Sequence, residues 1–572
     1  MKTLISTLIF ISFSISTYSQ TTLKESQKIS TFCKIWGFLK YYHPTVAKGK
    51  LDWDNEFTTR IKSLTLLNSK QEMCYYYSKW IDSLGKVEIC KKCKDKMPDS
   101  LKFNLDLTWL NDSTVFTNDL IKQLQYIKQN RNQGKNYYVQ QNKLIGNTSY
   151  ENEKSYLDSI FPSTELRLLG LSRYWNAVNY FFPYKYRIGR DWNEVLIEMI
   201  PKFKDSKDTI SYQLAMLELT TKINDSHARF ITSFTNKYFG IKWTPFKFKI
   251  IDNKAIVTDF YDDSICKIND IKRGDVFLSI NNESIEKIIK EKSKYIGASN
   301  EATRLRNFYN VLFNGNIDSL NVSFERNGIT MDKVIHRYDI NMFKYNWDNG
   351  ILIDKITNDY YINKSEVNHN KINPNEAWRI LNGNIGYVNL GLLQPEQVQE
   401  MKTKLNSTIA IIFDVRNFPN GTMYKIADFL NNENRPFVKF AIPDIAYPGV
   451  YHYTASLNCG KKNYQSYKGK IILIFNETSQ SHAEFTIMAL QTSPNVTSVG
   501  SQTAGADGNT SSISFPGGYR TNFTGIGVYY PDGRETQRVG IIPDIEVKPT
   551  IDGLKLGKDE VLEKAIETIN RK

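Results

Sequence analysis

An internal repeat near the beginning of the chain constrains its fold more than any other feature. Residues 34–54 read KIWGFLKYYHPTVAKGKLDWD and residues 173–193 read RYWNAVNYFFPYKYRIGRDWN, so Trp, an aromatic pair, Pro and Asp-Trp recur at matching offsets. A helix with Trp and Tyr on its inner face that stops before Pro, followed by an Asp that caps a second helix, satisfies both copies. The repeat therefore predicts two related helical hairpins with aromatic cores. An aromatic ligand platform is the less favoured interpretation.

Length and composition are typical of a multidomain globular protein. The chain has 572 residues, of which 41% are hydrophobic and 13% aromatic, which allows several domains of roughly 150 residues each. Lys and Arg number 74 against 60 for Asp and Glu, a net charge of +14, but the basic residues are interleaved with acidic ones. We therefore interpret the charge as a solvated basic surface and expect no nucleic-acid partner.

Residues 1–19 have the pattern of a secretory signal peptide. Lys2 precedes an apolar run from Leu4 to Ile15, and small polar residues follow at a plausible cleavage point. No cysteine closely follows the run, which disfavours a lipid anchor, and no later window has the apolar length of a membrane-spanning helix. We expect an exported protein, periplasmic or secreted, without an integral membrane segment after removal of the signal.

The cysteines in the N-terminal part of the chain, Cys33, Cys74, Cys90 and Cys93, are compatible with export. Cys90 and Cys93 form a Cys-x-x-Cys motif, which suits a disulfide or a zinc site. No histidine pair with ligand spacing is nearby to complete a zinc site. A structural disulfide among these cysteines is therefore favoured, and zinc is the alternative.

From Tyr238 onward the helical pattern gives way to short alternating runs that are typical of strands. Residues 271–285, in which a Gly-Asp turn feeds an apolar strand, resemble the most recognisable stretch of a PDZ domain. The resemblance implies that Phe239, Gly240 and Ile241 form the carboxylate-binding loop, whose N–H groups take a peptide's C-terminus by strand addition. A spacer or lid of the same fold is the alternative.

One segment combines an apolar strand, a polar turn and an apolar helix. Residues 471–475 are apolar, Ser481 lies in the turn, and the helix follows at once. At this point the helix offers unpaired N–H groups and a positive dipole end, where a nucleophile and its oxyanion hole can be built. Ser481-x-x-Glu484 is also a capping box, which is a purely structural alternative.

Two other segments carry polar residues suited to catalysis. Residues 224–230 form a polar turn that contains His227, and a serine nucleophile needs such a base, whose position is set by the fold. Residues 410–421 form a strand that ends in Asp-x-Arg and a turn containing Gly421. The backbone of that turn would donate to an oxyanion, or the segment is simply a strand end with an ion pair.

Together these segments resemble the C-terminal-processing (tail-specific) protease family over roughly residues 220–550. Ala506-Asp507 stand where the Ser–Lys branch has its catalytic Lys, so the sequence looks instead like the branch of the tricorn core protease. The motifs that carry the resemblance, in the family's order, are Asp-Ser-His227, Ile-x-Asp-x-Arg416 with Gly421, Ser481-x-x-Glu484, Val499-Gly-Ser-Gln-Thr-Ala-Gly505 and Gly540-Ile-Ile-Pro-Asp544.

The resemblance implies a role for each matching residue. Ser481 would be the nucleophile, His227 the general base and Ser226 the supporting hydroxyl. The N–H groups of Gly421 and His482 would form the oxyanion hole.

The carboxylate that supports the histidine is ambiguous. Glu535 lies near the family's Glu, whereas a strict count back from Gly540 puts Gln537 at that place. We prefer Glu535, because orienting a histidine and stabilising its cation needs an acceptor, preferably a charged one. A neutral Gln537 in this role would reduce activity.

We expect a multidomain α+β protein with helical N-terminal units, a PDZ-like β-rich domain and an α/β catalytic core of the ClpP/crotonase-like type. The expected function is that of an exported serine endopeptidase that cleaves polypeptides through an acyl-enzyme, with no cofactor and no metal. A catalytically weak or inactive peptide-binding relative is the alternative. The expected segments are 1–19 (signal peptide), 20–150 and 151–235 (helical units), 236–340 (PDZ-like domain) and 341–572 (catalytic core).

Overall fold

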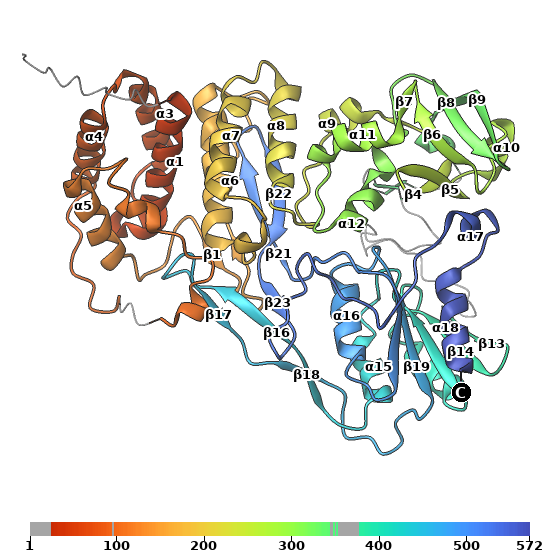
Figure 1. Ribbon diagram of the computed structural model, residues 1–572. Helices are drawn as coiled ribbons and strands as arrows, with labels where there is room; N and C mark the ends of the chain where they lie inside the picture. The colour runs from red at the N-terminus through yellow and green to blue at the C-terminus, as the bar shows by residue number, and fades with distance from the viewer. Residues whose placement is uncertain (1–23, 94–96, 344–346, 349–350, 353–376, 572) are drawn as a thin grey trace, which may run out of the picture.

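The computed structural model describes residues 24–93, 97–343, 347–348, 351–352 and 377–571. The expected signal peptide, residues 1–19, lies outside these ranges. Figure 1 shows helical units at one end, a middle domain rich in strands and a mixed core, so the expected mixed helix-and-sheet fold class is confirmed. Within the described ranges, no helix has both the length and the apolar character needed to cross a membrane.

The helices of the N-terminal half pack side by side as two groups (Figure 1). The first group contains α1 (Glu25–Tyr42), α2 (Pro44–Ala47), α3 (Trp53–Ser63), α4 (Lys70–Ser83) and α5 (Asn118–Gln129). The second contains α6 (Thr164–Phe181), α7 (Trp192–Lys204) and α8 (Thr209–Thr221).

Both copies of the sequence repeat contain the same reciprocal tryptophan pair. Trp36 Nε1 donates to the Trp53 carbonyl at 3.0 Å, and Trp53 Nε1 donates to the Trp36 carbonyl at 3.2 Å. In the second copy, Trp175 and Trp192 make the same two bonds at 2.7 and 3.0 Å. All four indoles are buried, and each pair is stacked. The pairs staple α1 to α3 and α6 to α7, which confirms the structural interpretation of the repeat.

The remaining repeated residues set helix ends as predicted. α1 ends at Tyr42 and α6 at Phe181, in each case just before the Pro of the repeat. Asp52 caps α3 and Asp191 caps α7 by accepting hydrogen bonds from backbone N–H groups of the first turn. The repeat is therefore a duplicated helical hairpin.

The Cys-x-x-Cys motif is oxidised. Cys90 and Cys93 form a disulfide, while Cys33 and Cys74 are buried thiols. The prediction of a disulfide among these four residues is confirmed. No group of three or more His, Cys, Asp or Glu in the described part of the chain is arranged to hold a metal ion, so the zinc alternative gains no support there.

The middle domain is built on an antiparallel sheet with the strand order β4-β5-β6-β8-β9. Its buried face is closed by apolar side chains from the flanking helices. The strands are β4 (Phe246–Ile251), β5 (Lys254–Phe260), β6 (Val276–Ile280), β7 (Glu283–Ser284), β8 (Ser319–Arg326) and β9 (Ile329–His336). The helices are α9 (Ser233–Phe239), α10 (Asp263–Ile268), α11 (Ile285–Lys292) and α12 (Glu301–Arg306).

The loop expected to bind a peptide carboxylate uses its N–H groups within the chain. Phe239 is the last residue of α9, and the Gly240 N–H donates to the Asn236 carbonyl at 2.8 Å. The Ile241 N–H donates to the side chain of Asn316 at 3.4 Å. A carboxylate would have to displace these bonds, so we do not propose Phe239, Gly240 and Ile241 as a peptide site.

The core domain is a three-layer sandwich around the sheet β13-β14-β15-β19-β20-β24, which is parallel from β14 to β24. Along β15, Ile411 and Phe413 pack with the helices α14 to α16, whereas Ala410 and Ile412 pack with α18 on the other face. The elements are β13 (Trp378–Leu381), β14 (Ile385–Asn389), α14 (Val398–Leu405), β15 (Ala410–Asp414), α15 (Met423–Leu430), β19 (Lys470–Phe475), α16 (His482–Leu490), β20 (Val496–Gly500), β24 (Ile545–Glu546), α17 (Ile551–Lys555) and α18 (Glu560–Asn570).

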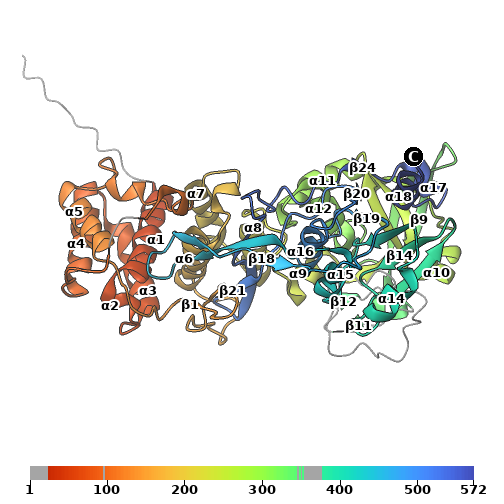
Figure 2. The same cartoon turned by 90° about the horizontal axis from the view of Figure 1, so that it is seen from below.

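An arm of antiparallel strands extends from the core toward the helical units (Figures 1 and 2). Its spine is β16, which pairs with three short strands, and a separate hairpin packs against α6. The arm contains β16 (Arg435–Pro443), β17 (Tyr451–Tyr453), β18 (Leu457–Cys459) and β23 (Gly527–Tyr529), and the hairpin contains β21 (Thr510–Phe515) and β22 (Tyr519–Thr524).

The parallel strands bring their carboxyl ends to one edge of the core sheet, where open α/β sheets bind ligands. The turns after β15 and β19 meet there. The Ser479 hydroxyl donates to the Val415 carbonyl at 2.6 Å, and the Thr478 hydroxyl donates to the Arg416 carbonyl at 3.1 Å. These bonds hold the Ser481 turn against the Gly421 turn.

Replacing Trp175 with Phe removes one donor of a buried reciprocal pair and keeps an aromatic ring. Because the Trp192 carbonyl then loses its partner, we expect the free energy of unfolding to fall by about 1–3 kcal/mol. Urea unfolding followed by tryptophan fluorescence and circular dichroism measures the loss. Trp378→Phe is the matched control, since the buried Trp378 Nε1 has no hydrogen-bond partner among the residues that the structure describes. Equal losses in the two variants would contradict the stapling role.

Candidate active site

Ser481 stands at the turn between β19 and α16 with a backbone conformation unusual for a side-chain-bearing residue. Its φ is +58° and its ψ is −119°. Its N–H donates to the Ala506 carbonyl at 2.9 Å and lies 3.2 Å from Glu484 Oε2. Such strain costs about 1–3 kcal/mol and persists only where surrounding contacts impose it. These contacts impose it here, and they hold Ser481 at the first turn of a helix.

Glu484 is the group that imposes this geometry. Its carboxylate is fully buried and accepts from the Thr503 hydroxyl at 2.5 Å, from the Gly505 N–H at 2.8 Å and from the Ala506 N–H at 3.0 Å. Burial raises the pKa of Glu484, and these hydrogen bonds oppose the rise. One carboxylate thus joins the Ser481 turn to the 503–506 loop.

His227 lies in the loop that follows α8 and is buried. Its Nδ1 is 2.9 Å from the hydroxyl oxygen of Thr524, and its backbone N–H donates to Asp225 Oδ1 at 3.0 Å. Burial lowers the pKa of His227 from its ordinary value of 6.5, and the nearby Asp225 opposes the fall. The imidazole is therefore neutral at pH 7, the form that a general base requires.

Asp225 is the carboxylate beside this histidine. Its Oδ1 lies 4.0 Å from His227 Nδ1 and accepts the Thr524 hydroxyl at 3.0 Å, while its Oδ2 accepts the Thr524 N–H at 2.7 Å. The side chain is completely buried. Our sequence interpretation gave Asp225 no role, although it stands two residues before His227, and nothing in the sequence pointed to Thr524.

Ser226, expected as the supporting hydroxyl, is bound to the middle domain. It exchanges hydrogen bonds with Ser299: the two hydroxyl oxygens are 3.1 Å apart, and each hydroxyl accepts from the other residue's N–H at 2.8–2.9 Å. This double contact fixes the backbone of the His227 loop.

The two expected oxyanion donors belong to the turns that meet at the sheet edge. Gly421 has φ +74°, and the space where a Cβ would stand is open. His482 begins α16, and its ring lies 5.7 Å from that of Phe418 in the Gly421 turn. The Asp414–Arg416 ion pair at the end of β15 is present as well, at 2.7 Å.

Glu535, expected to support the histidine, is engaged elsewhere. Its Oε1 accepts the Tyr186 hydroxyl at 2.6 Å, and its Oε2 pairs with Arg187 Nε at 2.5 Å. Gln537 is buried, and its amide nitrogen lies 3.5 Å from Asp225 Oδ1. Gln537 thus contacts Asp225, whereas Glu535 ties the core to the second helical unit.

A continuous set of contacts connects the serine turn to the histidine loop. Ser481 binds the Ala506 carbonyl, and the preceding residue, Gly505, accepts the Arg538 N–H at 2.8 Å. Gln537, the neighbour of Arg538, contacts the Asp225 beside His227. The contacts thus run from Ser481 at the edge of the core sheet to Asp225 in the His227 loop, whereas Glu535 pairs with the second helical unit.

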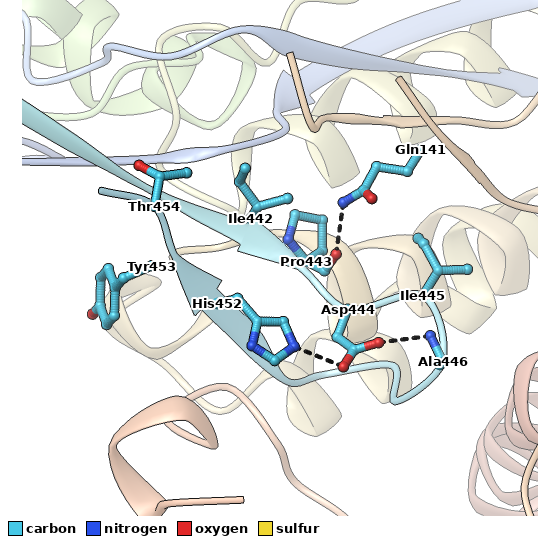
Figure 3. Close-up of a pocket in the computed structure, with 9 residues that line it drawn as sticks. All are labelled: Gln141, Ile442, Pro443, Asp444, Ile445, Ala446, His452, Tyr453 and Thr454. Atoms are coloured by element: carbon cyan, nitrogen blue, oxygen red, sulfur yellow. Dashed lines mark hydrogen bonds and ion pairs between the residues drawn. The ribbon is translucent and has the colours of Figure 1, made fainter. Parts of the chain in front are cut away.

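A hollow of about 430 Å³ lies elsewhere, between the β16–β17 turn and Gln141 (Figure 3). Its polar groups are committed to local structure: Asp444 accepts from the Ala446 N–H at 2.7 Å and pairs with His452 at 2.8 Å, and the Gln141 amide donates to the Pro443 carbonyl. None of the expected site residues lines it.

Comparisons with known proteins concern the core domain and the fold. Residues 384–547 match the model of peptidase family S41. Among solved structures, mature CPAF in complex with lactacystin is 13% identical with a TM-score of 0.52, covering 71% of this chain and 98% of its own. Mature CPAF alone is 15% identical with a TM-score of 0.53, covering 70% of this chain and 96% of its own. At such identities the likeness establishes the fold.

No curated protein matches the chain at a significant score. The family match covers the sheet edge described above, including β15, β19, Ser481 and the 503–506 loop. Residues 384–547 are therefore a peptidase family S41 domain, and by that domain the chain is a serine peptidase.

Proposed function

We propose that this protein is an endopeptidase that hydrolyses polypeptides through an acyl-enzyme on Ser481, with His227 as general base. The observation that carries the proposal is the strained conformation of Ser481 at the start of α16, which is fixed by a hydrogen bond to the buried carboxylate of Glu484. A serine with φ +58° costs stability that a simple helix cap does not need. The structural alternative, a capping box alone, does not explain why Ser481 has this strained conformation.

The reaction follows from the chemistry of these groups. His227 Nε2 takes the Ser481 proton while Ser481 Oγ forms a bond to the scissile carbonyl carbon, and the carbonyl electrons move onto oxygen. The imidazolium then gives the proton to the leaving amine as the C–N bond breaks. Water then attacks the ester of the acyl-enzyme, again with His227 as base, and the product acid is released as Ser481 takes the proton back.

The Gly421 and His482 N–H groups are the proposed oxyanion donors. His482 is the first residue of α16, so its N–H lies at the end of the helix where the dipole is positive. Gly421 has a left-handed backbone conformation, and the position that a Cβ would occupy is open. Backbone donors that are already oriented stabilise the developing charge without reorganisation.

We further propose that the protein acts outside the cytoplasm. Lys2 with the apolar run that follows it has the pattern of an export signal. The Cys90–Cys93 disulfide supports the same conclusion, because such bonds persist in oxidising compartments. Detection of a shortened N-terminus in protein recovered from the exported fraction tests this; recovery of the uncleaved chain in the cytosol contradicts it.

Ser481→Ala tests the proposed nucleophile. We expect wild-type protein to react with a fluorophosphonate probe and to cleave casein, and we expect the variant to lose the label and about 10⁴-fold or more of kcat. Ser407→Ala is the control, since Ser407 is an exposed residue of the core. Cleavage by the Ser481 variant at the wild-type rate would reject the mechanism, and an unlabelled, correctly folded wild type would favour the inactive peptide-binding relative.

Glu484→Gln tests the support of the Ser481 turn. An amide keeps one oxygen and turns an NH2 group either toward the Thr503 hydroxyl and Gly505 N–H or toward the Ala506 and Ser481 N–H groups, so the bonds of one carboxylate oxygen are lost. We expect a loss of about 2–4 kcal/mol in unfolding free energy and slower labelling of Ser481. Glu400→Gln, at an exposed position of α14, is the matched control. Wild-type labelling by a fully folded Glu484→Gln protein would show that this carboxylate does not hold the nucleophile.

A further inference from the structure

A histidine that acts as a general base needs a partner at its other ring nitrogen, which selects the tautomer and stabilises the cation. The family resemblance offers Glu535 for this role, with Gln537 as the competing position. In the structure, however, the carboxylate beside His227 belongs to Asp225. The inference that follows rests on the proposed function and concerns this partner.

Glu535 is unavailable for the role because two other groups hold it. Tyr186 and Arg187 occupy its two oxygens at 2.6 and 2.5 Å. Both come from the segment between α6 and α7, in the second helical unit. The ion pair with Arg187 neutralises the charge that a histidine cation would need.

Asp225 has the position that the role requires. It is completely buried, and its Oδ1 lies 4.0 Å from His227 Nδ1, too far for a direct hydrogen bond. The Thr524 hydroxyl stands between them, 2.9 Å from the ring nitrogen and 3.0 Å from the carboxylate oxygen. The Thr524 N–H and the His227 N–H hold both carboxylate oxygens in place at 2.7 and 3.0 Å.

The direction of these hydrogen bonds follows from proton counting. An ionised carboxylate only accepts, so the single proton of the Thr524 hydroxyl goes to Asp225. The hydroxyl oxygen is then an acceptor toward His227, which must carry its proton on Nδ1. Nε2 is left with a lone pair, which is the tautomer that removes a proton from serine.

We propose that Asp225 and Thr524 together orient and polarise His227, with the Thr524 hydroxyl relaying the influence of the buried carboxylate, and that Glu535 takes no part. Both are positioning residues, because they act on the substrate only through His227. Gln537 extends the unit, since its amide nitrogen lies 3.5 Å from Asp225 Oδ1.

The electrostatics around the ring agree with this assignment. Burial lowers the pKa of His227, Asp225 raises it, and Arg229 on the same loop lowers it further. Thr524 and Gln537, which contact this unit from β22 and from the loop after β23, carry no charge. Removal of the Asp225 charge should therefore lower the pKa of His227 further below 6.5.

The experiment compares Asp225→Asn with Glu535→Gln, each an isosteric loss of one charge. We expect Asp225→Asn to reduce kcat about 10²–10⁴-fold with little change in KM, and to shift the acidic limb of the kcat profile to lower pH. We expect Glu535→Gln to remain within about threefold of wild type, as an exposed ion pair contributes little. A Glu535→Gln loss as large as that of Asp225→Asn would overturn the proposal.

Thr524 supplies a second pair of variants. Thr524→Val keeps the shape and removes the hydroxyl, and we expect about a 10–100-fold loss of kcat. Thr524→Ser restores the hydroxyl and should recover activity to within about threefold of wild type. Equal activities of the Val and Ser variants would contradict the relay.

A measurement independent of turnover separates this proposal from the proposed function. In protein with ¹⁵N-labelled histidine rings, His227 should be protonated on Nδ1 at neutral pH, and Asp225→Asn should lower its pKa while Glu535→Gln leaves it unchanged. An unchanged pKa in Asp225→Asn overturns the relay even where Ser481 still reacts with fluorophosphonate. Loss of Ser481 labelling in wild type, with the NMR result as expected, rejects the peptidase mechanism and leaves the hydrogen-bonded unit standing.

Discussion

The active-site geometry depends on one buried carboxylate. Glu484 receives hydrogen bonds from Thr503, Gly505 and Ala506, and its own helix places it three residues after Ser481. Burying a charge is expensive unless donors surround it, and here backbone and hydroxyl donors do so. Because these donors come from the loop after β20, the carboxylate fixes the distance between that loop and the nucleophile turn.

The middle domain contacts the His227 loop, the 503–506 loop and the serine turn. Ser299 binds Ser226, and the Asn300 amide donates to the Thr503 carbonyl at 2.8 Å. Arg306 donates to the Glu477 carbonyl at 2.7 Å and to the Gln480 side chain at 2.9 Å, directly before Ser481. Residues 299–306, which comprise α12 and the two residues before it, thus contact both loops, and a movement of the middle domain would shift the serine turn and the histidine loop together.

Local sequence predicted what local forces determine. The apolar run before Ser481, the polar turn and the helix after it are visible in the chain because burial and helix capping act within a few residues. The repeated Trp and Asp residues likewise predicted the helical hairpins correctly. The partner of His227 was not, since Arg187 captures Glu535 across 348 residues of sequence and Thr524 reaches Asp225 across 299. No rule of sequence spacing predicts contacts at such separations, and the bond from the Ile241 N–H to Asn316, 75 residues away, has the same origin.

The repeat also accounts for the surroundings of Glu535. In sequence Glu535 lies near the position of the family's catalytic Glu, but in the structure it is bound by residues of the second copy of the repeat. The two copies share their Trp, Tyr, Pro and Asp-Trp residues and differ at most other positions, including the turn by which the second copy contacts the catalytic domain. In that turn, Tyr184, Tyr186 and Arg187 stand where the first copy has Thr45, Ala47 and Lys48. Tyr184 exchanges hydrogen bonds with both the N–H and the carbonyl of Val528, while Tyr186 and Arg187 hold Glu535. These polar and aromatic side chains dock the second copy on β23 and on Glu535, so Glu535 belongs to a contact between the second helical unit and the core. The turn of the second hairpin thus supports the region of the proposed active site through Tyr184, Tyr186 and Arg187.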